Sequence, residues 1–166
     1  MPVTQHTKLF GEAIKVGERL LMASTRHQIV TSPIIKEITH KYFFEQQDNS
    51  IFTLSELDEK RLNKLVDILE AKSGESDFTV DVLGKEMSLS KSSLNRVILA
   101  LLETTPNALI NEFRLNKALS LLRKSGDSIA EISFTTGFTS PSYFSKCFQK
   151  RFDITPTKYL EMLHNR

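Results

Sequence analysis

Two similar segments, residues 83–98 and 132–148, restrict the possible folds of this chain more than any other feature. Each has two stretches in which apolar residues recur three and four positions apart, separated by a few small or polar residues. Residues at that spacing share one face of an α-helix, so each segment predicts two short helices joined by a tight turn. The segments align when the second has one extra residue in its turn. The repeat therefore predicts a helix-turn-helix twice in one chain.

Capping signals predict where the helices begin. A residue that can cap a helix N-terminus precedes each helical stretch beyond position 54: Ser55, Thr79, Ser90, Thr105, Ser128, Ser140 and Thr155. Proline follows Thr105 and Thr155, and proline at the first helical position loses no hydrogen bond. Alternation with a period of two residues never lasts, so strand signals are weak. We expect an all-α fold with seven helices after residue 54.

The chain before position 55 has a weaker pattern. Residues 13–22 have helical apolar spacing, whereas residues 30–52 mix β-branched and polar residues. We expect residues 1–54 to form a helix and a linker, and residues 55–166 to form the helical domain. With 40% hydrophobic and 25% charged residues, the chain has the composition of a soluble globular protein with a buried core.

Several classes of protein are disfavoured by what the sequence lacks. No stretch approaches the roughly 18 consecutive apolar residues that span a bilayer, and the first residues lack the plan of a signal peptide. Cys147 is the only cysteine, and the four histidines are scattered without paired ligand spacing. No catalytic or phosphate-binding motif is present. We expect a cytoplasmic protein without membrane contact, metal site, cofactor or enzymatic activity.

Positive charge is concentrated in the second half of the chain. Residues 1–76 contain 10 Lys and Arg against 11 Asp and Glu, whereas residues 77–166 contain 12 against 9. The excess of 12 over 9 favours an anionic partner for the second half.

The second helix of each repeat has a polar stripe opposite its apolar one. In the second repeat the stripe is Ser142, Ser145, Lys146 and Gln149, and in the first it is Ser92, Asn95 and Arg96. Arg can bond guanine with two hydrogen bonds, and Asn or Gln can do so with adenine. A polar stripe can also be merely a solvated face. Its repetition, with Arg96 and Lys146 at equivalent places, favours contact with the DNA major groove.

The sequence resembles the DNA-binding region of the AraC/XylS family of transcription regulators over about residues 57–163. The resemblance is carried by motifs in the family's order and spacing: Arg114-Leu115-x-x-Ala118-x-x-Leu121-Leu122, Ile129-Ala130-Glu131-Ile132, Gly137-Phe138, Ser142-Tyr143-Phe144-Ser145-Lys146, Phe148-x-Lys150-x-Phe152 and Thr155-Pro156-x-x-Tyr159. It implies seven helices, with two helix-turn-helix units joined by a long helix. It also implies that the two recognition helices read successive major grooves.

Within that family, the sequence is most similar to members at the C-terminal end of hybrid two-component sensor proteins, where a receiver precedes the DNA-binding region. Residues 52–60 look like the lead-in to that region, and residues 13–25 look like the tail of a receiver. The resemblance thus implies the output region of a two-component signalling protein.

The predicted DNA-binding residues have different roles. We expect base-edge contacts from Asn95, Arg96, Lys146 and Gln149. We expect backbone positioning by Lys91, Ser92, Ser142, Ser145 and Lys150. The helix starts at Ser90 and Thr105 offer amide groups to phosphate, and Ser140 begins the second reading helix. Tyr143 either contacts phosphate or packs beside Phe144.

Other conspicuous residues have structural explanations. Ser88 stands where the family commonly has a turn glycine, and Asp153 replaces a frequent helix-ending glycine, so we expect left-handed backbone at both. Arg114 is expected to tie the long helix to a neighbouring unit, and Cys147 to be a small buried side chain. The core is expected to include five phenylalanines: Phe134, Phe138, Phe144, Phe148 and Phe152.

The sequence therefore predicts a transcription regulator that binds double-stranded DNA sequence-specifically. The alternative is a helical protein-interaction module that keeps the fold without specific DNA binding. Two further partners stay open: a second copy of the chain, joined through upstream parts, and RNA polymerase. No site for a small-molecule ligand is evident, because 54 residues are too few for the ligand-binding barrel that the resemblance would imply.

Overall fold

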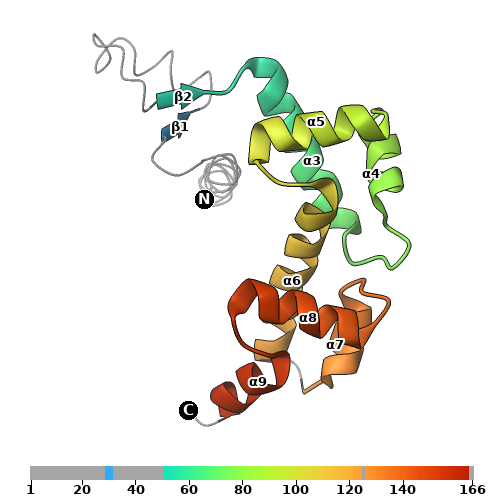
Figure 1. Ribbon diagram of the computed structural model, residues 1–166, viewed down its shortest axis with the longest axis vertical. Helices are drawn as coiled ribbons and strands as arrows, with labels where there is room; N and C mark the ends of the chain where they lie inside the picture. Colours follow the sequence, from blue (N-terminus) through green and yellow to red (C-terminus); the bar gives the residue numbers. More distant parts are fainter. Residues whose placement is uncertain (1–28, 32–50, 125, 165–166) are drawn as a thin grey trace, which may run out of the picture. The chain divides into compact units, whose positions relative to one another are not determined.

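The computed structural model describes residues 29–31, 51–124 and 126–164. Within these residues, two short strands precede seven helices (Figure 1). Their bounds are β1 Ile29–Thr31, β2 Ile51–Thr53, α3 Glu56–Lys72, α4 Val80–Glu86, α5 Lys91–Leu102, α6 Pro106–Lys124, α7 Ile129–Thr135, α8 Pro141–Phe152 and α9 Pro156–His164. The predicted all-α domain with seven helices is confirmed. None of the described helices is long and apolar enough to cross a membrane.

One of two compact units in the chain contains β1, β2, α3 as far as Val66, and the segment Val97–Glu103. Its strands pair in parallel, with Ile29 opposite Ile51. These two three-residue strands were not predicted within the expected linker, where β-branched residues such as Ile29 and Ile51 favour extended backbone. The predicted helix over 13–22 and the predicted receiver tail over 13–25 lie outside the described residues. Buried side chains of this unit are Leu54, Leu62, Leu65, Val66, Ile98 and Leu101.

The other compact unit contains Asp67–Arg96 and the chain from Thr104 onward. Helix α6 is its central element, because α6 contacts α4, α7, α8 and α9. Seven buried side chains form a hydrophobic cluster between α6, α7 and α8: Leu115, Ala118, Leu122, Ile132, Phe138, Phe144 and Phe148. Cys147 and Phe152 pack against this cluster and are partly buried. Cys147 was predicted to be buried, and it is only partly buried at the edge of this cluster.

One predicted core residue is on the surface. The Phe134 side chain is 54% exposed, so its assignment to the core was wrong. In the seven-residue helix α7, Ile132 and Ser133 are the buried residues. Each residue of an α-helix is rotated by about 100° from the previous one, so Phe134 lies about 200° around the helix from Ile132. The helix therefore directs this ring away from the core that Ile132 enters.

The predicted N-caps are confirmed by backbone hydrogen bonds. The side-chain oxygens of six capping residues accept from an amide three residues later at 3.1–3.4 Å: Ser55, Thr79, Ser90, Thr105, Ser140 and Thr155. Ser128 forms a full capping box, because it accepts from the Glu131 amide and donates its own amide to the Glu131 carboxylate at 2.8 Å. Hydrogen bonds from Ser128 hold the pKa of the Glu131 carboxyl below its usual range.

The two helix-turn-helix units, α4–α5 and α7–α8, have matching dimensions. Helices α4 and α7 have 7 residues each, and α5 and α8 have 12 residues each. The first turn has four residues (87–90) and the second has five (136–140), which confirms the predicted extra residue. Ser88 and Gly137 occupy the same left-handed position, with φ values of 57° and 88°. The predicted left-handed backbone is thus confirmed at Ser88, and also at Asp153 with φ 59°.

We expect Ser88→Gly to raise the free energy of unfolding by about 1 kcal/mol, because a left-handed non-glycine residue costs roughly 1–2 kcal/mol and glycine loses part of that gain to its greater flexibility. Urea denaturation followed by circular dichroism measures the change. Ser76→Gly is the control, because Ser76 is also an exposed loop serine and its φ is not positive. Equal shifts in both variants would contradict the assignment of strain to Ser88.

Candidate nucleic-acid interface

The first half of α5 presents its predicted polar residues to solvent. Leu94 is fully buried, whereas Ser92, Asn95 and Arg96 are exposed. Ser90 caps the helix by accepting from the Ser93 amide at 3.2 Å. The predicted stripe is therefore an accessible surface, positioned by the burial of the opposite face.

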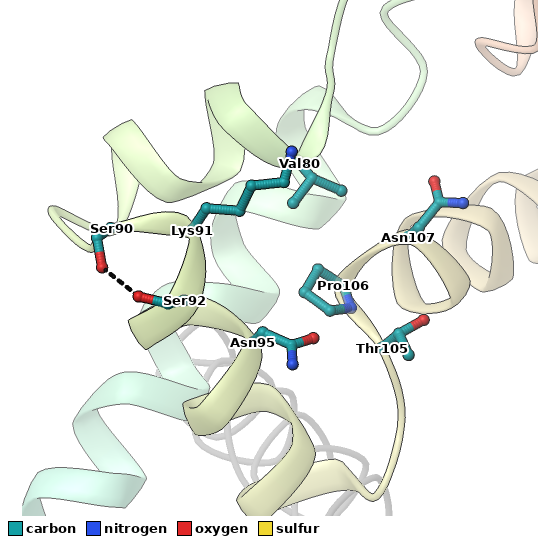
Figure 2. Close-up of a pocket in the computed structure, with 8 residues that line it drawn as sticks. All are labelled: Val80, Ser90, Lys91, Ser92, Asn95, Thr105, Pro106 and Asn107. Atoms are coloured by element: carbon teal, nitrogen blue, oxygen red, sulfur yellow. Dashed lines mark hydrogen bonds between the residues drawn. The ribbon is translucent and has the colours of Figure 1, made fainter.

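A groove lies between the start of α5 and the start of α6. It has a volume of about 700 Å³ and is lined by Val80, Ser90, Lys91, Ser92, Asn95, Thr105, Pro106 and Asn107. Figure 2 shows Ser90, Lys91, Ser92 and Asn95 on one side, with Thr105, Pro106 and Asn107 on the other. The groove thus brings together five predicted DNA-binding residues. Asn107 was not among the predicted residues, although its position two residues after the cap Thr105 places it in the exposed first turn of α6.

Helix ends give this groove a favourable environment for anions. The first amides of α5 and α6 have no partner inside their own helix, and a helix N-terminus carries a partial positive charge. Neither helix has an acidic residue in its first turn, and neither does α8. By contrast, α3, α4 and α7 each have at least one, whereas α9, outside the predicted surface, also has none. The three helix starts on the predicted DNA-binding surface therefore lack the carboxylates that would repel phosphate.

Lys91 takes part in an ion pair at the edge of the groove. Its Nζ lies 3.3 Å from Oδ1 of Asp81, and both side chains are about 70% exposed, at 72% and 68%. Exposed pairs of this kind contribute about 0–1 kcal/mol because water screens them. The Lys91 ammonium can therefore exchange Asp81 for a phosphate at little cost.

Helix α8 carries the second predicted surface. Ser142, Lys146, Gln149 and Lys150 are exposed, and Phe144 and Phe148 are fully buried on the opposite face. Ser145 is only half-buried, so it offers less surface than the stripe predicted. In the described part of the chain, neither Lys146 nor Lys150 forms an ion pair, and the same holds for Arg96 on α5.

Tyr143 and Ser140 have structural contacts. The Tyr143 hydroxyl accepts from Nδ2 of Asn111 at 3.2 Å, and its ring centroid lies 6.1 Å from that of Phe138. Tyr143 therefore packs beside Phe138, but its side chain is still 46% exposed and remains accessible from solvent. Ser140 caps α8 through the Tyr143 amide at 3.3 Å.

Helix α6 holds α8 and α9 by side-chain hydrogen bonds. Glu112 accepts from Nε of Arg151 at 2.8 Å, and this contact raises the pKa of the Arg151 guanidinium above its usual value. Arg123 donates from Nε to the Tyr159 hydroxyl at 2.8 Å. Helix α8 is therefore attached to α6, while its predicted DNA-binding face remains exposed.

Comparison with known proteins agrees with this arrangement. Residues 83–162 match the family described as "Helix-turn-helix domain". The histidine kinase P4 of Formosa agariphila is 41% identical over 110 residues, which are 66% of this chain and 8% of that protein. A transcriptional regulator of the AraC type from Chromobacterium violaceum aligns with a TM-score of 0.58 at 27% identity, over 66% of this chain and 96% of that one.

A second solved structure is the C-terminal domain of the two-component response regulator yesN from Fusobacterium nucleatum. It aligns with a TM-score of 0.55 at 28% identity, over 58% of this chain and 93% of that one. The chain itself spans between 8% and 40% of the length of the first curated relatives that it matches.

The repeated unit of helices on one central helix defines a helix-turn-helix protein. Its family is equally clear from these matches: the chain carries an AraC-type DNA-binding domain, as its sequence resemblance implied. Two further relatives, MtrA of Neisseria gonorrhoeae at 30% identity and RhaS of Escherichia fergusonii at 33%, are named as a transcriptional regulator and a transcriptional activator.

Proposed function

We propose that this chain binds double-stranded DNA sequence-specifically and regulates transcription, with α5 and α8 in successive major grooves. The observation that carries the proposal is the repetition of one exposed stripe on equivalent helices, with side chains that can read base edges. Helix α6 has 19 residues, which corresponds to about 28 Å at 1.5 Å per residue. That length is close to the roughly 34 Å of one DNA turn.

The roles of the site residues follow from their chemistry. Asn95, Arg96, Lys146 and Gln149 read base edges, and Lys91, Ser92, Ser142, Ser145, Tyr143 and Lys150 position the DNA backbone. The helix starts at Ser90, Thr105 and Ser140 donate backbone amides to phosphate. The groove between α5 and α6 adds Asn107 to the phosphate-binding set.

The first test is selection of bound fragments from a random pool of duplex DNA at about 150 mM salt, where weak nonspecific contacts are suppressed. We expect an enriched motif with two short blocks about 10 bp apart, as two grooves read on one face require. A single block would restrict base reading to one helix. If no motif is enriched, the selection is repeated with the chain dimerised by fusion to a coiled coil. Absence of enrichment in both selections would refute the proposal.

Arg96→Ala and Lys146→Ala are each expected to weaken binding to the selected duplex by about 1–3 kcal/mol and to relax specificity at one position of the motif. Fluorescence anisotropy with the selected duplex and single-base variants measures this change. Lys158→Ala, which removes an exposed lysine on α9, serves as the charge-matched control. A uniform loss across all duplexes with a shallower salt dependence would instead assign the residue to phosphate contact.

A two-component origin fits the same comparisons. The similarity to a histidine kinase and to a response regulator supports the assignment of residues 55–166 as the output domain of a cytoplasmic signalling protein. Residues 1–54 then form the connection to a receiver. We also propose that the protein forms a homodimer through parts upstream of this domain and that it contacts RNA polymerase.

The second candidate is a protein-interaction module. It is favoured by the sparse positive charge of the first helix-turn-helix, where the apolar run Val97-Ile98-Leu99 follows Arg96 and the Leu99 side chain is 52% exposed. The salt dependence separates the two functions, because binding through several phosphates weakens steeply as salt rises.

A further inference from the structure

Arg114 lies near the middle of α6 and binds the loop that leads into the first helix-turn-helix. Its Nε donates to the carbonyl oxygen of Ser73 at 2.8 Å. Its Nη2 donates to the carbonyl oxygens of Glu75 at 3.1 Å and Phe78 at 2.9 Å. These three acceptors belong to the loop 73–79 between α3 and α4, so one guanidinium fixes the backbone just before α4 begins.

The same guanidinium contacts the turn of the second helix-turn-helix. Its Cζ lies 5.8 Å from the centroid of the Phe138 ring, a distance typical of cation–π contact. A Cβ atom on the neighbouring Gly137 would lie 2.6 Å from the Ser73 carbonyl oxygen and 2.9 Å from Arg114 Nε. The turn therefore packs directly against both Arg114 and the loop that Arg114 holds.

The chemistry of this contact suits a rigid connection. All three hydrogen-bond acceptors are neutral carbonyls, and hydrogen bonds from a charged donor are stronger than neutral ones. The guanidinium is planar, with its donors in a fixed fork, so three acceptors also fix its orientation. Burial lowers the pKa of Arg114, but an arginine in a protein keeps its charge.

Other polar contacts of α6 have a more local reach. Arg123 reaches Tyr159 of α9, and Glu112 reaches Arg151 of α8. Each of these pairs attaches one neighbouring helix to α6. Arg114 differs from them because its side chain bonds the entrance of the first helix-turn-helix and also touches the turn of the second.

We propose that Arg114 is a positioning residue that locks the α7–α8 unit to the α3–α4 loop and to α4. It thereby sets the spacing at which the exposed stripes of α5 and α8 meet DNA. The locking itself does not depend on DNA. The consequence for DNA spacing rests on the proposed function.

The first experiment measures the locking without DNA. Nitroxide labels on Lys85→Cys in α4 and Lys150→Cys in α8, in a Cys147→Ala background, report the distance between the two units by double electron–electron resonance. We expect one narrow distance distribution for the parent and a broad one for Arg114→Met. Arg123→Met, which removes an exposed arginine from the same helix, is expected to leave the distribution narrow.

A milder variant, Arg114→Lys, tests the same contact in case Arg114→Met does not fold. It keeps the charge, but an ammonium lacks the planar fork that reaches three carbonyls, so broadening is again expected. A folded Arg114→Met with the parent's narrow distribution would overturn the proposal. If Arg114→Met and Arg114→Lys both unfold where Arg123→Met remains folded, Arg114 is a stability residue and the proposal is likewise overturned.

The second experiment uses duplexes in which the two blocks of the selected motif are moved by one or two base pairs. Each base pair changes the separation by about 3.4 Å and the direction by about 35°. We expect the parent and Arg123→Met to bind the shifted duplexes at least about tenfold more weakly, a loss comparable to that from a mismatched base pair. Folded Arg114 variants are expected to lose this preference.

The two experiments distinguish failure of the proposed function from failure of the proposed role of Arg114. If the parent binds no duplex, the proposed function fails while the distance measurement still decides the locking. If Arg114→Met broadens the distance distribution but keeps the parent's preference for block spacing, the proposed control of DNA spacing is refuted.

Discussion

Phe148→Ala is expected to lower the free energy of unfolding by about 3–5 kcal/mol, because removal of a buried phenylalanine ring loses both its transfer free energy and its packing. Phe148 is fully buried in α8. Its ring centroid lies 5.7 Å from that of Phe144, 4.7 Å from that of Phe152 and 5.9 Å from that of Tyr159. The substitution would therefore leave a cavity between α8 and α9, beneath the buried face of α8.

Chemical denaturation measures this loss, and the chain offers a control with the same substitution. Phe134→Ala removes an identical ring from the surface of α7, where the side chain is 54% exposed. We expect its effect to be within about 0.5 kcal/mol, as is usual for surface positions. Similar losses for the two variants would mean that the aromatic series of α8 does not form the core described above.

Gly137→Ala is the second variant with a large expected effect, a loss of about 3 kcal/mol or more. The residue has φ 88°, and this left-handed backbone alone costs a non-glycine residue roughly 1–2 kcal/mol. A Cβ would also lie 2.6 Å from the Ser73 carbonyl oxygen, a contact that backbone atoms on both sides must move to relieve. Steric overlap therefore adds to the conformational cost.

Thermal and urea denaturation of Gly137→Ala test this expectation. Gly126→Ala is the steric control, because a Cβ there would meet no atom within 4 Å. We expect it to change stability far less. A comparison with the equivalent position is also informative, since Ser88 already carries a Cβ at the same place in the first turn. If Gly137→Ala is as stable as the parent, the second turn does not pack against Ser73 as described.

The sequence by itself determined the helices and their repetition. Helix starts at residues such as Thr79 and Ser128 are fixed by hydrogen bonds to amides three residues away, and helix faces follow from a period of 3.6 residues. Both signals act within one or two helical turns, so they can be read without knowing the fold. The exposed stripes with Arg96 and Lys146 were predictable for the same reason.

The tertiary structure decided which residues meet across the chain. The pairing of β1 with β2 depends on neighbours that local spacing does not identify. A role for Arg114 in tying α6 to a neighbouring unit could be predicted. Its partners Ser73 and Phe78 lie 41 and 36 residues earlier and present only backbone carbonyls, which every residue possesses. No side-chain pattern marks such acceptors, so only the folded chain shows that one guanidinium bonds the loop before the first helix-turn-helix and also contacts the turn of the second.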